Sequence, residues 1–427
     1  MAPRVVQVQE VPGVEAAIST ANPTECATRI RSTLSGGAEP TEVVRTGALV
    51  AARHFAPAIP PPHALLALSA SLDLAGRTEP PNLAVVQACA LAAREWRSAE
   101  LAAPDHVVSG DELHLARSFV AAVRAPDLME ADAIFSGLVR EGDERRLAGD
   151  ALFEACAQDL AGEGHKLTFA VGSWRLVRSL GWTRPAVLLR PAVHLAAGTT
   201  QDRSANGSVL REVGRSRLDL ELATRNTAPI DQVARNTYEI ALNVGPDRVV
   251  ADLINGLKRG RAPTAYADLV AATAAEKLIT NPAALEPALF ALAARFVLSF
   301  SRTSTHVLAL LLAARMVAGV PAESAPEAVR VSDPEAALRD LSGAIESGNA
   351  RDSARIALGL VLEDRSAVLA DRLIRHACRA EASADAGHRL LYAAWGSELA
   401  SVAPGPALPS LAAVLGRAHP SRAGSSA

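Results

Sequence analysis

Apolar residues recur every three or four positions along most of this chain, and that spacing is the strongest constraint on its fold. It places apolar side chains on one face of an α-helix, whereas a half-buried strand would need strict alternation. Alanine, the strongest helix former, dominates these segments. Glycine and proline interrupt the pattern often, which keeps each predicted helix short. The sequence therefore predicts an all-α fold of many short antiparallel helices, packed as an α-α array or bundle.

The polar and proline-containing stretches divide the chain into five predicted parts. They are a flexible N-terminal lead, three helical parts and a disordered tail, in the order 1–25, 26–200, 201–320, 321–416 and 417–427. Short turns join the predicted helices throughout. The same pattern is therefore also consistent with one continuous domain over residues 26–416.

The charge and hydropathy of the chain argue against binding to nucleic acid or to membranes. The net charge is −3 and no dense basic face is visible, so nucleic-acid or anionic-membrane binding is not predicted. The longest apolar run, 307–320, is too short to span a bilayer and contains Arg315. The first residues lack the apolar segment of a signal peptide. We therefore predict a soluble, cytoplasmic protein, and the sequence leaves its oligomeric state open, a homo-oligomer included.

The spacing of the four cysteines indicates their chemical state. Cys26, Cys89, Cys156 and Cys378 form no CxxC pair and lie far apart in the sequence. This spacing excludes a zinc ribbon and a cysteine-bound iron–sulfur cluster. It is typical of buried free thiols in a reducing compartment.

Histidines stand at or near the starts of several apolar helical segments, with a weaker copy of the pattern at His114. The pattern is clearest at His63, His165, His306 and His388 and weaker at His194, and these five are the candidates. Imidazole is the commonest protein metal ligand and titrates nearest to neutral pH. If these helix ends converge, the imidazoles can bind one metal ion inside a helical shell. The sequence thus predicts a histidine-lined, metal-containing pocket, with these five residues as candidate ligands.

The long segment that starts at His165 supplies the other candidates. His165 and Lys166 are the predicted catalytic residues, as general bases. Trp174 and Arg178 are four residues apart on the same predicted helix, where they can stack and line a pocket for a flat ligand. The zinc-protease motif HExxH and the di-iron motif ExxH are both missing from the sequence. Metal ligands would therefore have to come from several helices.

Two short stretches resemble the questin oxidase-like family. Residues 190–198, RPAVHLAAG, are similar to a His-Pro-Leu-Ile-His-Leu-Gly segment of that family, and residues 62–68, PHALLAL, to its His-His-Leu-Leu helix start. The resemblance implies an all-α oxidoreductase that opens anthraquinone-type rings with NADPH, and it carries over to His63 and His194. Pro62 and Arg190 stand where the family tends to have a further histidine, so a paired-histidine site is not implied.

These observations favour one function and leave others open. The favoured function is that of a metal-dependent oxidoreductase of the oxygenase type, acting on a small apolar or aromatic substrate. Iron is the expected metal, with NADPH or another electron donor. The alternatives are a non-catalytic helical-repeat scaffold that binds a protein partner, and a metal-dependent hydrolase or lyase that uses the same histidines.

Overall fold

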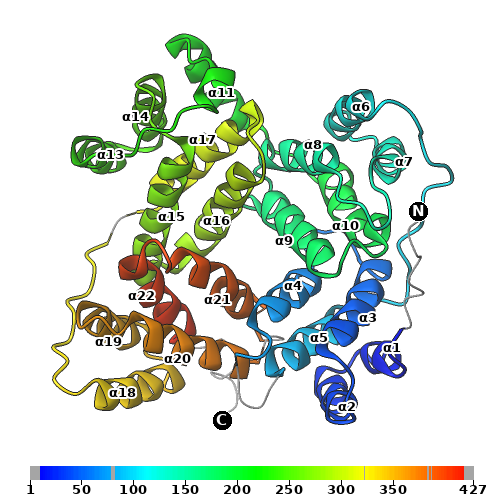
Figure 1. Ribbon diagram of the computed structural model, residues 1–427, viewed down its shortest axis with the longest axis horizontal. Helices are drawn as coiled ribbons and strands as arrows, with labels where there is room; N and C mark the ends of the chain where they lie inside the picture. The colour runs from blue at the N-terminus through cyan, green and yellow to red at the C-terminus, as the bar shows by residue number, and fades with distance from the viewer. Residues whose placement is uncertain (1–9, 78–81, 322, 382–383, 386, 418–427) are drawn as a thin grey trace. The chain divides into compact units, whose positions relative to one another are not determined.

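A computed structural model describes residues 10–77, 82–321, 323–381, 384–385 and 387–417 (Figure 1). Within these residues the chain forms helices α1 to α22 and one short 3-10 helix, η1, and no strand. The prediction of an all-α fold is confirmed. The predicted disordered tail, apart from Arg417, and the first nine residues of the predicted lead lie outside the described residues. The rest of the lead contains α1 and the start of α2.

The chain divides into two compact units. Unit 1 comprises Met1–Ala155, Phe169–Thr200 and Ala377–Ala394, and unit 2 comprises Cys156–Thr168, Gln201–His376 and Trp395–Ala427. One of these boundaries, between Thr200 and Gln201, coincides with a predicted boundary. The remaining boundaries divide the predicted N-terminal and C-terminal parts between the two units.

Eight helices lie wholly within unit 1. They are α1 (Val14–Ile18), α2 (Pro23–Ser35), α3 (Pro40–Arg53), α4 (Ala64–Leu74), α5 (Leu83–Glu95), α6 (Glu112–Arg124), α7 (Leu128–Leu138) and α10 (Pro185–Gly198). In this unit α5 packs against both α2 and α4, and α10 packs against α3 and α7. Small residues permit this close packing: a Cβ atom at Gly47 of α3 would already touch the Cys89 sulfur of α5, at 3.5 Å.

Ten helices and η1 lie wholly within unit 2. They are α11 (Ser204–Ser216), α12 (Leu220–Ala223), α13 (Gln232–Val244), α14 (Pro246–Lys258), α15 (Pro263–Thr280), η1 (Pro282–Ala284), α16 (Leu285–Phe300), α17 (Ser304–Gly319), α18 (Pro334–Glu346), α19 (Ala350–Leu362) and α22 (Pro404–Leu415). The helices α15 and α16, most of whose residues are buried, pack against each other, and α17 packs against both. In Figure 1, α18, α19 and α22 form a second layer of neighbouring helices in this unit.

Four helices contribute residues to both units: α8 (Arg146–Ala157), α9 (His165–Ser179), α20 (Ser366–Arg379) and α21 (His388–Leu399).

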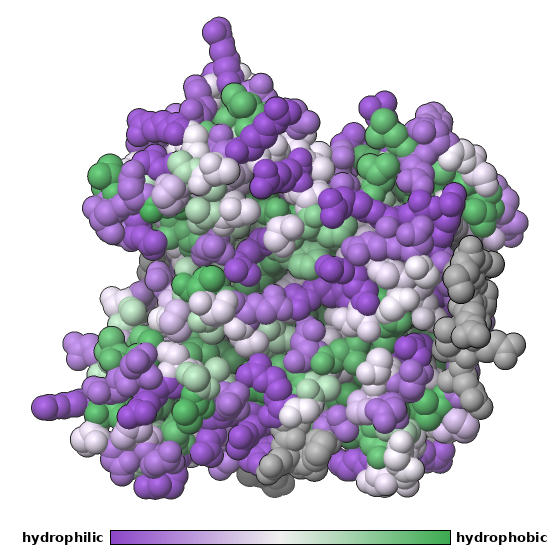
Figure 2. Space-filling view, in the orientation of Figure 1, coloured by the Kyte–Doolittle hydropathy of each residue, from purple (hydrophilic) through white to green (hydrophobic). Residues whose placement is uncertain are grey.

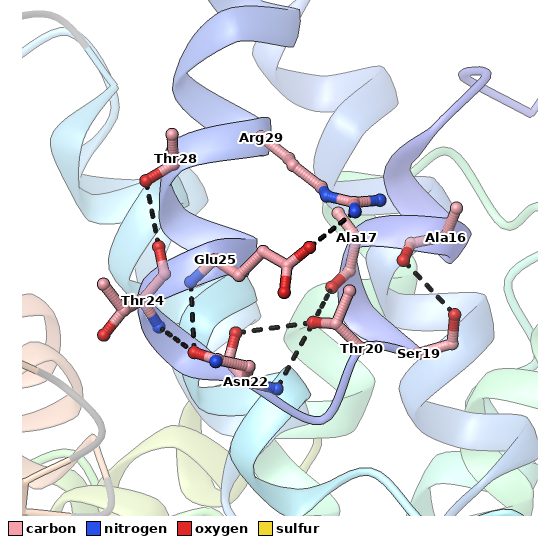
Figure 3. Close-up of polar contacts among 9 residues, drawn as sticks. All are labelled: Ala16, Ala17, Ser19, Thr20, Asn22, Thr24, Glu25, Thr28 and Arg29. Carbon is pink, nitrogen blue, oxygen red and sulfur yellow. Dashed lines mark hydrogen bonds and ion pairs between the residues drawn. The ribbon is translucent and has the colours of Figure 1, made fainter.

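Side-chain caps explain where many of these helices begin. Asn22 precedes α2, and its side-chain oxygen accepts hydrogen bonds from the backbone N–H groups of Thr24 and Glu25 (Figure 3). Figure 3 also shows Arg29 paired with Glu25 one turn earlier. Asp111, Asp127, Asp219, Asp231, Asp333 and Asn349 cap other helices in the same way. Such a cap satisfies backbone donors that the helix itself leaves unpaired.

One helical stretch, Pro282–Phe300, is long and apolar enough to cross a membrane by length and composition, and 61% of its most apolar window is buried. A helix in the core of a folded protein passes the same test of length and composition. In the face that Figure 2 presents, hydrophilic residues surround separate groups of hydrophobic ones. Exposed single apolar side chains are normal on the surface of a folded protein.

Candidate functional site

Two of the predicted ligands, His63 and His388, lie side by side in unit 1. Their ring centroids are 4.6 Å apart, with 54° between the ring planes. A ring nitrogen of one lies within 4.8 Å of a ring nitrogen of the other. Two imidazole nitrogens bound to one tetrahedral ion are about 3.4 Å apart, so a small movement brings both onto one ion. The structure thus brings together two histidines that are more than three hundred residues apart in the sequence.

His63 is held by a carboxylate from a neighbouring helix. The Glu95 side chain, at the end of α5, accepts the backbone N–H of His63 at 3.0 Å and that of Ala64 at 2.7 Å. These are first-turn donors of α4, which no residue within the helix can satisfy. Burial raises the pKa of Glu95, and the two backbone hydrogen bonds oppose that rise. Glu95 therefore fixes the start of α4, and with it the backbone of His63.

His388 is held by a turn of its own. Its Nδ1 lies 2.7 Å from the carbonyl oxygen of Asp385, which also accepts the His388 backbone N–H at 3.2 Å. A carbonyl oxygen can only accept, so Nδ1 carries the proton and the lone pair is on Nε2. Gly387 makes the turn at φ +78°, and a Cβ atom there would lie 2.9 Å from Leu91 Cδ2. Metal-binding histidines commonly use their second ring nitrogen in this way.

His165, at the start of α9, has the same turn within unit 2. Its Nδ1 and its backbone N–H both contact the carbonyl oxygen of Gly162. Gly164, at φ +84°, is again the preceding residue, and a Cβ atom there would lie 2.3 Å from the Phe290 ring. The Nε2 atom faces a carboxylate, Glu286 Oε2, at 3.3 Å. Its predicted roles as metal ligand and catalytic base stay predictions.

Lys166 forms a buried ion pair. Its Nζ lies 2.6 Å from Asp159 Oδ2, and both side chains are almost fully buried. The other carboxylate oxygen of Asp159 accepts the backbone N–H groups of Ala161 and Asp202. A buried pair of this kind is costly to break. The structure thus shows a structural partner for Lys166, and its predicted role as a general base remains untested.

The structure gives the last two predicted metal ligands other partners. His194 Nε2 lies 3.1 Å from Asp132 Oδ2, an oxygen that Arg190 also contacts at 3.1 Å. His306 is buried at the start of α17, where its Nδ1 lies 3.2 Å from the Ser301 carbonyl oxygen. Each contact lies within one unit and orients its imidazole. Neither contact adds a ligand to the pair of His63 and His388.

The two predicted substrate-binding residues lie in different surroundings. Trp174 is fully buried and packs edge-on against Phe153 and Trp182, at centroid distances of 5.6 and 4.9 Å. Arg178 is exposed, and its Nε lies 3.5 Å from Glu144. Trp174 is therefore part of the aromatic core of unit 1, and its predicted contact with a ligand is untested.

Sequence reasoning did not single out a small pocket at the start of α4. It is lined by His54 and Phe55 at the end of α3, by Pro62, and by Glu95 and Trp96 at the end of α5. The His54 and Trp96 rings pack with their centroids 5.4 Å apart. Its walls are mostly apolar, and Pro62 and Ala64 flank His63 in the chain. Nothing in the local sequence pairs residue 54 with residue 96, because the contact depends on how α3 and α5 pack.

The chain was compared with family models, with curated proteins and with solved structures, and none of the three comparisons found a match.

Proposed function

We propose that the protein is a metal-dependent oxidoreductase in which His63 and His388 bind a transition-metal ion. The observation that carries this proposal is the adjacency of the two imidazoles in unit 1. A second observation supports it: the hydrogen bond from Nδ1–H of His388 to the Asp385 carbonyl places the lone pair of the ring on Nε2, the arrangement that metal-binding histidines commonly use.

The ligand type favours a particular group of metals. Neutral imidazole suits iron, copper, nickel and zinc, whereas magnesium and calcium prefer oxygen ligands. Among these, iron fits the expected oxidation, and the resemblance to the questin oxidase-like family supports that choice together with NADPH as electron donor. The bound ion would supply the redox chemistry, and the chain would supply its orientation and shielding from water.

The expectation of a small apolar or aromatic substrate draws on the apolar walls of the pocket beside His63, which would have to widen to admit an aromatic ring. Phe55, Pro62, Leu65 and Trp96 offer apolar surface, and flat aromatic walls favour flat ligands. We place this activity in the cytoplasm, because all four cysteines are free and buried.

Metal analysis of the purified full-length chain tests the proposal. We expect near-stoichiometric iron or another transition metal, and its loss in His63→Ala and in His388→Ala. His106→Ala is the matched control, since His106 is exposed in a loop of the same unit and should leave the metal content unchanged. Circular dichroism of each variant separates metal loss from unfolding.

Two results would overturn the proposal. One is a wild-type protein that neither co-purifies with a transition metal nor binds added Fe²⁺, Zn²⁺ or Ni²⁺. The other is a folded His388→Ala variant that keeps the full metal content. In either case the helical scaffold becomes the better account of the chain.

A further inference from the structure

A second pocket lies within unit 2, between α11, α14 and α17, which are neighbours in Figure 1. Its polar lining residues are Ser208, Arg211, Glu212, Arg215, Asp247 and Arg315. Val209 and Val250, both almost fully buried, form its apolar base. Three guanidinium groups from two helices thus surround one small volume, and they outnumber the carboxylates there.

The carboxylates neutralise only part of this charge. Arg215 pairs with Glu212 one turn earlier on α11, and Arg315 of α17 pairs with Asp247 at the start of α14. Among the described residues, Arg211 forms no ion pair. Its guanidinium lies across Gly207, where a Cβ atom would be 3.5 Å from Nη1. A positive charge without a carboxylate partner therefore remains in the pocket.

We propose that this pocket binds the phosphoryl group of a small molecule. Guanidinium groups bind phosphate oxygens through paired N–H donors, and a phosphoryl group has enough oxygens to engage more than one arginine. A carboxylate has only two oxygens and is satisfied by a single guanidinium. The Ser208 hydroxyl, also in the lining, adds a neutral donor of the kind that phosphate sites use.

The two ion pairs predict how substitutions in the pocket change its affinity for a phosphoryl group. A bound phosphoryl group competes with Asp247 for Arg315, and it is repelled by the exposed carboxylate of Asp247. Removing that carboxylate should therefore strengthen binding, while removing any of the arginines should weaken it. A surface that merely carries exposed ion pairs would show neither effect, since each such pair contributes little on its own.

Isothermal titration of the full-length chain with inorganic pyrophosphate tests the proposal, with citrate as a carboxylate probe of comparable charge. We expect pyrophosphate to bind and citrate to bind at least about tenfold more weakly. Arg211→Gln should lower the pyrophosphate affinity about tenfold, the effect of losing one charged hydrogen-bond donor. Asp247→Asn should raise the affinity about threefold.

Arg339→Gln, an equal charge change at an exposed position of α18 in the same unit, is the matched control and should leave the affinity unchanged. Absence of pyrophosphate binding, equal binding of citrate, or equal losses in Arg211→Gln and Arg339→Gln would each overturn the proposal. None of these measurements depends on a metal at His63 and His388, so the two proposals stand or fall separately.

Discussion

The turns that carry His388 and His165 are nearly identical, yet the two imidazoles face different groups. In both, a glycine at positive φ precedes the histidine, and the carbonyl three residues earlier accepts both the backbone N–H and Nδ1–H. His388 faces a second imidazole, that of His63, whereas His165 faces the carboxylate of Glu286. Two adjacent imidazoles suit a metal ion, and a carboxylate suits a hydrogen bond from an imidazole N–H. The turn orients each ring, and we expect the neighbouring group to influence its chemistry.

The largest expected effect comes from the glycines that make these turns. Gly164→Ala puts a methyl group into the Phe290 ring at a positive φ, and we expect a loss of about 3 kcal/mol in the free energy of unfolding. Gly387→Ala meets Leu91 and Ala67 at longer distances and should cost about 2 kcal/mol. Urea denaturation measures both values.

Gly343→Ala on α18 is the matched control for these variants. A methyl group added there meets nothing within 4 Å, and the backbone φ at Gly343 is not positive. We therefore expect the free energy of unfolding to rise by about 0.5 kcal/mol. If the alanines at 164 and 387 left stability unchanged, or raised it as expected at 343, the two turns would not be rigid.

The next effect is the response of stability to metal. At a free metal concentration a hundredfold above the dissociation constant, a bound ion stabilises the native state by about 2.7 kcal/mol. We expect this gain in the wild type and its removal by EDTA or by His388→Ala. Thermal unfolding with and without Ni²⁺ or Zn²⁺ measures it.

His165→Ala tests whether the imidazoles on the two turns have different roles. If the variant keeps the full metal response, the imidazole that faces Glu286 has a role separate from the pair of His63 and His388. If it loses the response as His388→Ala does, the prediction that His165 is a ligand of the same ion gains its first support, and the contrast between the two turns fails.

The sequence supports the fold prediction better than the prediction of the site. The three-and-four spacing is a local property, so the all-α class follows from it. The position of His63 at a helix start is visible in the sequence, but its neighbour His388 and its anchor Glu95 depend on tertiary packing. No spacing within one helix could indicate them.

The smallest expected effect on stability comes from removing Glu95 or Glu286, the carboxylates beside His63 and His165. Glu95→Ala leaves the backbone N–H groups of His63 and Ala64 without their acceptor, and we expect a loss of about 1.5 kcal/mol together with weaker metal binding. Glu286→Ala removes a side-chain contact of His165, whose turn keeps the bonds to Gly162, so about 0.5 kcal/mol is expected. Urea denaturation and metal titration of both variants measure these effects, with Glu100→Ala, an exposed carboxylate, as control. Equal losses of stability and metal affinity in Glu95→Ala and Glu286→Ala would contradict this prediction. They would mean that a carboxylate bound to the backbone of a histidine and one bound to its ring position the imidazole equally well.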